Sequence, residues 1–131
     1  MSNGIFKTKE VAKKAYVVLG LSALLVVMQL FNELTGLSLI QYGLIPRETV
    51  GLWGIITSPF IHSSISHLLS NLIGFIFLSS LIIWRGINHY FKISLFLIFS
   101  SGILVWIFGP VHGVVVGASG VIFGYIGYLL A

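Results

Sequence analysis

Residues 66–84 read SHLLSNLIGFIFLSSLIIW and contain no Lys, Arg, Asp or Glu. A helix of this length can cross the hydrocarbon layer of a membrane. Two polar side chains, His67 and Asn71, stand near its beginning, and Trp84 ends it at the depth where aromatic rings meet lipid headgroups. The segment therefore predicts a membrane-spanning helix with a polar start.

The rest of the 131-residue chain has the same character. It is 57% hydrophobic and 8% charged, with a mean hydropathy of +1.08, whereas soluble domains carry about 25% charged residues. Charge-free stretches cover residues 15–32, 49–84 and 93–131, which is more apolar surface than a core of this size can bury. The composition excludes an ordinary soluble domain and predicts an all-α, polytopic membrane bundle.

The few charges predict the orientation of this bundle. Six of the seven Lys and Arg residues lie within residues 1–14 or in the turn at 85–92, and only Arg47 lies between them. The positive-inside rule then makes the N-terminus and this turn cytoplasmic, so that the connections at 32–61 and 109–118 share the outer side. No basic stripe with interleaved aromatic residues is present, so nucleic acid is not a predicted partner.

The first charge-free stretch predicts a retained membrane span at residues 15–31. A secretory signal peptide is the alternative, but the apolar run is longer than a usual h-region and no small-x-small cleavage site closes it. We therefore divide the chain into a basic cytoplasmic N-terminus at residues 1–14 and a transmembrane domain at residues 15–131.

Two more spans are expected after residues 66–84. The third, at residues 93–108, ends at the Gly-Pro pair 109–110, because proline lacks the backbone N–H that continues a helix. The fourth begins near Ser119 and is still apolar at Ala131, without a cap, a charge or an interfacial anchor. The sequence thus predicts a transmembrane domain that is truncated within its fourth span.

One cluster of polar residues opens the second span. His67 and Asn71 are four residues apart and share one helix face, whereas His62 precedes the regular helix. Hydrogen bonding to a neighbouring helix would explain these side chains as well as a functional site does. A metal site is disfavoured, because His62 and His67 lack metalloprotease spacing and no carboxylate is near them in sequence. We predict no metal and no cofactor.

A second cluster opens the fourth span. Gly120, Gly124 and Gly127 form a small-residue stripe on one helix face, which favours close approach of another helix. Taken alone, the motif at residues 117–120 is better explained by packing than by catalysis. Ser119, however, stands at a helix N-terminus entered from a Gly-rich turn, where free N–H groups and the helix dipole can stabilise an oxyanion.

Together the two clusters contain most of the parts needed for acyl transfer. They supply a serine hydroxyl, a backbone N–H, an imidazole and an amide. A general base is missing, because neither His67 nor His62 can act as a base and a hydrogen-bond donor at once. His112, seven residues before Ser119, is a base only if the turn at 109–118 folds back, and it is interpreted as a loop residue. Since the chain has no Cys, thiol nucleophiles are excluded.

The order and spacing of these residues resemble the rhomboid family of intramembrane serine proteases. The match consists of His62-x4-His67-x3-Asn71 followed by Gly-Ala-Ser-Gly at 117–120, and it covers roughly residues 50–131. The combination is specific, whereas each half alone would be weak.

The resemblance implies a role for each matched residue. Ser119 would be the nucleophile in a water-filled cavity, and His67 and Asn71 would line the oxyanion hole with the Ser119 N–H. His62, together with Gly117 and Gly120, would support that site. Phe123, Gly124 and Gly127 would serve helix packing, with Phe123 where the family often packs an aromatic ring on the catalytic histidine.

Two departures from the family pattern are visible. The family's common Trp-Arg pair in the first loop reads Trp53-Gly54 here. In addition, the family carries its general base, a histidine beside a glycine, on a sixth span, and the sequence reaches only the fourth. The resemblance therefore implies that this stretch alone is inactive, and that Gly120, Gly124 and Gly127 form the docking face for the later helix.

The sequence as a whole predicts a serine endopeptidase that hydrolyses peptide bonds of transmembrane substrates, in the inner membrane of a bacterium with the N-terminus cytoplasmic. The alternatives are a catalytically inactive rhomboid-like protein that binds transmembrane helices, and an unrelated transporter or channel fragment. The predicted partners are transmembrane proteins and the lipid bilayer. No oligomeric state is predicted.

Overall fold

The fold is described from a computed structural model, which places residues 2–131 and the side chains of residues 7–131. Within this range the chain forms five α-helices and no strand. The helices are α1 (Ser2–Thr35), α2 (Gly54–Thr57), α3 (Ile65–Ile83), α4 (Ile87–Phe108) and α5 (Ser119–Leu130), with short 3₁₀ turns η1 (Leu39–Tyr42), η2 (Thr49–Trp53) and η3 (Ser58–Phe60).

Three of these helices are long and apolar enough to cross a membrane, and they correspond to the first three predicted spans. They are Lys7–Thr35, Ile65–Ile83 and Ile87–Phe108, whereas α5 is shorter. Large apolar side chains such as Ile73 and Phe96 are more than two-thirds exposed, as expected of surfaces that face lipid. The chain is therefore an all-α integral membrane protein.

Two helices begin earlier than the sequence predicted. The third span was expected from residue 93, but α4 begins at Ile87, directly after Gly86, whose φ of +129° sets the turn. Tyr90 then lies on the buried face of this helix, so residues 87–92, which were expected in a turn, belong to its first turns. Likewise α1 continues through the predicted boundary between residues 14 and 15. Met1 lies outside the described residues, and the domain division stays a prediction.

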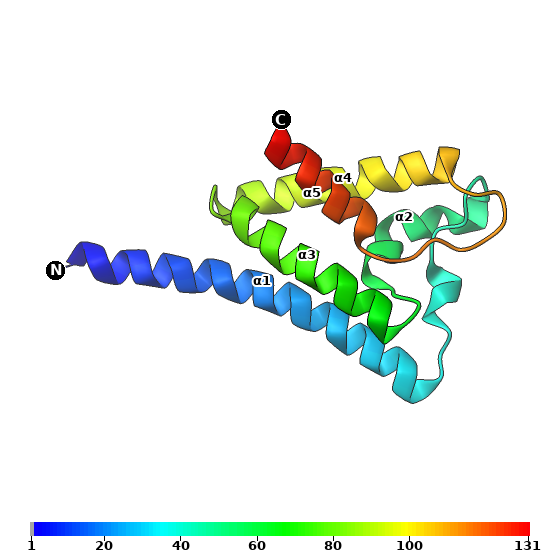
Figure 1. The fold of residues 1–131 in the computed structure, drawn as a ribbon, viewed down its shortest axis with the longest axis horizontal. Coiled ribbons are helices and arrows are strands. Elements are labelled where there is room, and N and C mark those ends of the chain that lie inside the picture. The colour runs from blue at the N-terminus through cyan, green and yellow to red at the C-terminus, as the bar shows by residue number, and fades with distance from the viewer. Residues whose placement is uncertain (1) are drawn as a thin grey trace.

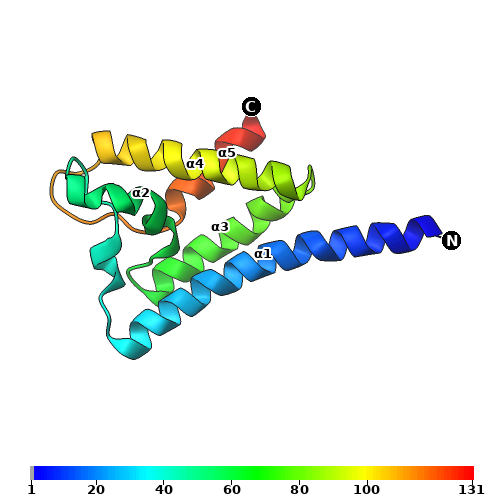
Figure 2. The ribbon, with the colours of Figure 1, turned by 180° about the vertical axis from the view of Figure 1, so that it is seen from behind.

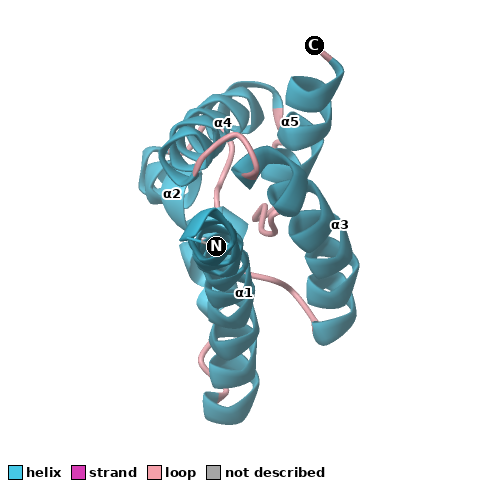
Figure 3. Cartoon of the chain, turned by 90° about the vertical axis from the view of Figure 1, so that its left-hand side faces the viewer, coloured by secondary structure: helices cyan, strands magenta, loops and turns pink. Residues whose placement is uncertain are grey.

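The helices run back and forth along one direction, so that the connections collect at opposite ends (Figures 1 and 2). The connections at 36–64 and 109–118 lie together at one end, which we name the loop end, as the sequence predicted. The turn at 84–86 lies at the other end, which we name the turn end. The helix α3 packs against both α1 and α5, and α5 packs against α4; the view along α1 in Figure 3 shows α3 beside it.

Backbone hydrogen bonds join the two connections at the loop end. Leu44 and Val115 form a single antiparallel bridge, with N···O distances of 2.9 and 2.8 Å, and the Gly117 N–H donates to the Ser58 carbonyl at 2.8 Å. Gly54 lies against the Leu44 backbone so closely that no Cβ could be placed there. This contact explains why the position holds glycine, where the first loop of the family commonly has arginine.

Arg47 holds the end of α4 against the first connection. Its backbone N–H donates to the Trp106 carbonyl at 3.0 Å, and its guanidinium donates to the carbonyls of Ile107 at 3.1 Å and Gly109 at 2.7 Å. The last carbonyls of a helix have no partner within the helix and attract positive charge. Arg47 therefore caps α4 from a distant part of the sequence.

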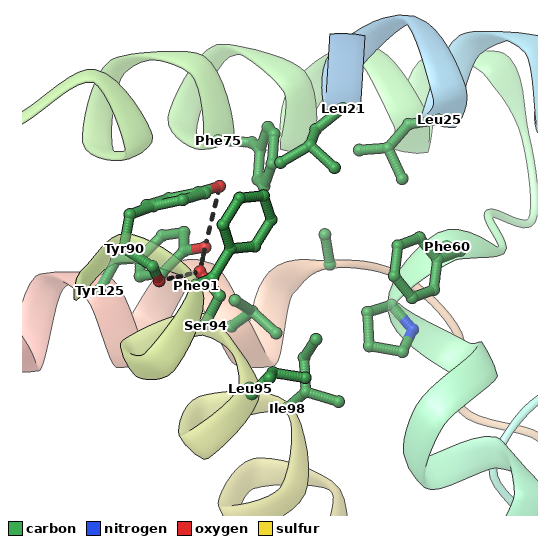
Figure 4. A pocket seen from close by; sticks show the side chains of 13 residues that line it. Leu21, Leu25, Phe60, Phe75, Tyr90, Phe91, Ser94, Leu95, Ile98 and Tyr125 are labelled. Carbon is green, nitrogen blue, oxygen red and sulfur yellow. Dashed lines mark hydrogen bonds between the residues drawn. The ribbon is translucent and has the colours of Figure 1, made fainter. Parts of the chain in front are cut away.

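Buried hydroxyl groups link α3, α4 and α5 closer to the turn end, and Figure 4 shows those on α4 and α5. The Ser94 Oγ lies 2.7 Å from the Tyr125 OH and donates to the Tyr90 carbonyl at 2.8 Å. The Tyr90 OH lies 3.1 Å from the Ser79 Oγ and 3.3 Å from the Tyr125 OH. We name Ser79, Tyr90, Ser94 and Tyr125 the tyrosine network. It borders an apolar cavity of about 210 Å³.

Basic residues at the turn end rest on aromatic rings. The Lys14 Nζ donates to the Trp84 carbonyl at 3.1 Å and lies 5.0 Å from the centre of that ring. The Arg85 Nη1 donates to the Tyr128 OH at 2.8 Å, and the His89 Nε2 lies 2.7 Å from the same oxygen. These contacts are typical of side chains at a membrane interface.

Candidate functional site

The start of α3 fixes the positions of the histidines. Ser64 is the N-cap residue: its backbone is extended, and its Oγ accepts a hydrogen bond from the His67 N–H at 3.1 Å. His62 therefore lies before the helix, while His67 and Asn71 lie on the same face of it, as the sequence predicted.

His67 and Asn71 converge on the backbone of Gly117. A Cβ atom at Gly117 would lie 2.8 Å from the His67 Nε2 and 3.2 Å from the Asn71 Nδ2. The φ of +110° at Gly117 is a conformation that residues with a side chain rarely adopt. Glycine is thus required here twice, by the backbone turn and by the two side chains that approach it.

Three polar atoms of this site are buried and have no hydrogen-bond partner among the described residues. They are both ring nitrogens of His62 and the Asn71 Nδ2. The His62 ring lies edge-on to the His67 ring at 5.2 Å between centres, and 1% of His62 is exposed. Burial, together with the nearby His67, lowers the pKa of His62 to about 4. His62 is therefore neutral at neutral pH.

Ser119 is the first residue of α5 and lies two residues after Gly117. Ala118, the N-cap residue, provides no side-chain cap, so the first N–H groups of the helix are not capped by it. Ser119 lines a cavity of about 150 Å³ together with Ser58, Ser101 and Gly117. Its hydroxyl makes no hydrogen bond within the described residues, to His67 or to any other group.

The glycines that follow Ser119 face α4. A Cβ at Gly120 would lie 3.3 Å from the Ser101 side chain, and one at Gly124 would lie 2.6 Å from the Leu97 Cδ2. The expectation that the whole stripe is free to dock a later helix is therefore wrong, because α4 already occupies these two positions. A Cβ at Gly127 would meet no atom of the described residues within 4 Å, and Phe123 is 71% exposed.

The other histidine of the outer connections lies apart from this site. His112 is exposed in the connection between α4 and α5, as predicted for a loop residue. Within the described part of the chain, no group of three or more His, Cys, Asp or Glu side chains could hold a metal ion.

Ser63 is a member of the site that the sequence pattern did not reveal. Its Oγ lies 3.0 Å from the His67 Nδ1, on the side of the ring away from the nitrogen that faces Gly117. The signal was present, because Ser63 and His67 are four residues apart. This spacing did not predict the contact, because Ser63 precedes the helix and the position of its side chain depends on the N-cap residue Ser64.

Comparisons with known proteins identify the family to which this chain is similar. A profile of the Rhomboid domain matches residues 49–131. Uncharacterized proteins of Mycobacterium bovis and Mycobacterium tuberculosis are each 32% identical over 118 residues, covering 86% of this chain and 49% of their own length. An uncharacterized protein of Mycobacterium leprae is 32% identical over 120 residues, covering 86% and 47%.

The chain spans about half the length of these relatives. No solved structure was found to match it. The matched region runs from η2 to the end of α5 and includes every residue of the site described above. On this match the chain belongs to the rhomboid family of membrane proteins.

Proposed function

We propose that this protein is an intramembrane serine endopeptidase that hydrolyses peptide bonds of transmembrane substrates, with the Ser119 Oγ as nucleophile. One observation carries the proposal. The His67 Nε2 and the Asn71 Nδ2 both lie about 3 Å from one point beside Gly117, two residues before Ser119. Two nitrogen donors that meet beside a serine at a helix N-terminus are suited to bind a carbonyl oxygen that becomes negative.

The proposed reaction follows from these positions. The Ser119 Oγ attacks the substrate carbonyl carbon, its proton passes to a base, and the carbonyl oxygen becomes an oxyanion. Hydrogen bonds from the His67 Nε2, the Asn71 Nδ2 and the Ser119 N–H stabilise that oxyanion. The base then gives its proton to the leaving amine, and water hydrolyses the acyl-enzyme in the same way.

The base is the part that residues 2–131 do not provide. The Ser119 hydroxyl has no hydrogen-bond partner there, and His112 is exposed in its loop. The activity is therefore proposed for a protein in which a histidine outside the 131 residues supplies the base. We expect the 131-residue chain alone to be inactive.

The charge pattern supports an orientation for this enzyme. Six of seven basic residues lie at the turn end or on the first part of α1, and Arg47 alone lies at the loop end. By the positive-inside rule the N-terminus is cytoplasmic and the site opens on the opposite side. In a bacterial inner membrane, substrates would be cut near the outer face.

Covalent labelling tests the proposal directly. The longer protein, in proteoliposomes, is treated with a serine-reactive fluorophosphonate, and labelling is followed by mass spectrometry. We expect one labelled site at Ser119 that is lost in Ser119→Ala and kept in Ser101→Ala, since Ser101 lines the same cavity. No labelling at Ser119, or equal labelling at Ser101, would exclude a serine nucleophile at this position.

The unpartnered Ser119 hydroxyl favours one alternative, a catalytically inactive rhomboid-like protein that binds transmembrane helices. Such a protein would bind a transmembrane partner equally well before and after Ser119→Ala. Site-specific photo-crosslinking to a transmembrane peptide measures this. An enzyme predicts peptide cleavage by the unmodified protein and intact crosslinked peptide in Ser119→Ala, whereas a binder predicts intact peptide in both.

A further inference from the structure

The ring of His67 is held by a residue to which no role has been assigned. We propose that the Ser63 hydroxyl fixes the tautomer of His67, so that the hydrogen of the imidazole sits on Nε2. The Ser63 Oγ lies 3.0 Å from the His67 Nδ1, within hydrogen-bond distance. In a neutral imidazole one nitrogen donates and the other accepts, and the partner of one nitrogen determines the state of the other.

Consecutive serines hold His67 at two points. Ser64 accepts from the His67 backbone N–H, and Ser63 contacts the Nδ1 of the same residue. The Ser64 Oγ also lies 3.0 Å from the Ser66 Oγ, which makes no contact with the ring. The backbone and the ring of His67 are therefore positioned by different hydroxyls, which can be removed separately.

The neighbouring amide indicates which nitrogen carries the hydrogen. The Asn71 Nδ2 is a donor, and it lies close to the same point beside Gly117 as the His67 Nε2. The Asn71 Nδ2 is buried without any partner among the described residues, so no hydrogen bond joins it to the His67 Nε2. Two donors aimed at one point, with Ser63 donating to Nδ1, account for this arrangement.

The inference rests on the proposed function for its role in catalysis, although not for the tautomer itself. With the hydrogen on Nε2, His67 donates to the oxyanion and has no lone pair on that side to accept the Ser119 proton. With the hydrogen on Nδ1, the same ring would be a base and a poor oxyanion donor. Ser63 is thus a positioning residue, which acts through His67 and does not touch the substrate.

Nitrogen NMR of the histidine rings tests the tautomer. The 131-residue chain is prepared with ¹⁵N-labelled histidine in lipid nanodiscs at neutral pH, and two-bond ¹H–¹⁵N correlations report which nitrogen of each ring is protonated. The chain has four histidines, and His67→Gln assigns the signals of interest. We expect a protonated Nε2 and an unprotonated Nδ1 for His67.

Matched variants show whether Ser63 is the cause. Ser63→Ala should replace the single tautomer by an exchanging mixture, and Ser63→Thr, which keeps the hydroxyl, should restore it. Ser66→Ala is the control and should change nothing. A protonated Nδ1 in the unmodified chain overturns the proposal, and so does an unchanged His67 spectrum in Ser63→Ala.

Activity of the longer protein gives a second readout. Ser63→Ala should lower kcat and leave KM unchanged, because the oxyanion forms only after substrate binds. A loss through KM alone would contradict the positioning role. If the tautomer depends on Ser63 while Ser119 is never labelled, the proposed peptidase fails and the role of Ser63 in fixing the ring stands.

Discussion

The site at the loop end and the tyrosine network differ in how their buried polar groups are partnered. Every hydroxyl of the tyrosine network bonds to another member or to a nearby carbonyl. At the loop end, both ring nitrogens of His62 and the Asn71 amide nitrogen have no partner among the described residues. The two sites are linked by the same helices, α3 and α5.

This difference in hydrogen bonding distinguishes polar groups that stabilise the fold from polar groups that are candidates for binding a substrate. A buried polar group without a partner costs about 1–3 kcal/mol, whereas a satisfied network stabilises the fold. Polar groups that only join helices have no reason to stay unpaired, and the tyrosine network shows that this chain can pair them. The Asn71 amide nitrogen, which is unpaired beside Gly117 among the described residues, therefore fits the proposed oxyanion site. Variants at each site should separate activity from stability.

The largest expected effect is on catalysis at the loop end. Asn71→Ala in the longer protein should lower kcat by about 10²- to 10³-fold, the usual loss of one oxyanion donor. The melting temperature should hardly change, because the lost amide nitrogen has no partner among the described residues. Cleavage of a transmembrane peptide in proteoliposomes and thermal unfolding measure the two quantities. A large fall in stability with unchanged kcat would place Asn71 with the structural groups instead.

A second comparison uses two glycines of the same connection. Gly117 and Gly113 both have positive φ, but only Gly117 would place a Cβ against His67. Each substitution by Ala should cost about 1–3 kcal/mol of stability from backbone strain, and Gly117→Ala should also displace His67 and lower kcat, by less than Asn71→Ala does. Denaturation and cleavage assays on both variants test this. Equal activity in the two variants would show that the approach of His67 to Gly117 is not needed.

The third prediction concerns pH. The pKa of His62 is about 4 in the folded protein and 6.5 in its ordinary state, so the unfolded chain binds more protons between these values. Stability is therefore fully present above pH 6.5 and falls as the pH is lowered toward 4, by at most about 1.4 kcal/mol per pH unit from this group. Thermal unfolding in detergent from pH 7 to pH 4 measures the slope.

His62→Phe should flatten that slope, and His112→Phe, at an exposed loop position, should leave it unchanged. A slope that is the same in all three proteins would show that His62 is not held neutral by burial.

The smallest effect is expected in the tyrosine network. Tyr125→Phe should lower the free energy of unfolding by about 1–2 kcal/mol, since the buried Ser94 and Tyr90 hydroxyls each lose a neighbour. Cleavage at saturating substrate should be unaffected. Tyr16→Phe is the control, because Tyr16 is 74% exposed. Loss of activity in Tyr125→Phe without loss of stability would show that the network serves the site.

The spans and the central part of the site could be predicted from sequence because both depend on local spacing. A long apolar run predicts a spanning helix by itself, and residues four apart, such as His67 and Asn71, must share a helix face. The beginning of α4 was missed because the span was counted from the charge-free run that follows Lys92, whereas the helix begins at Ile87, directly after Gly86.

What could not be predicted depends on contacts between distant parts of the chain. The capping role of Arg47 can be predicted only when the position of the end of α4 is known. The requirement for glycine at residue 54 can be predicted only when the path of the backbone at Leu44 is known. The stripe at Gly120 and Gly124 predicted that a helix comes close, but small residues do not indicate which helix. The structure assigns these two positions to α4.

The bridge between Leu44 and Val115 has a consequence for biosynthesis. Ribosomes make the chain from its N-terminus, so Leu44, Ser58, His67 and Asn71 are all present before Val115 and Gly117 emerge. His67 and Asn71 are thus already present in the growing chain, and the backbone that leads to Ser119 joins them later. A partly synthesised chain consequently exposes no assembled site to the other proteins of its membrane.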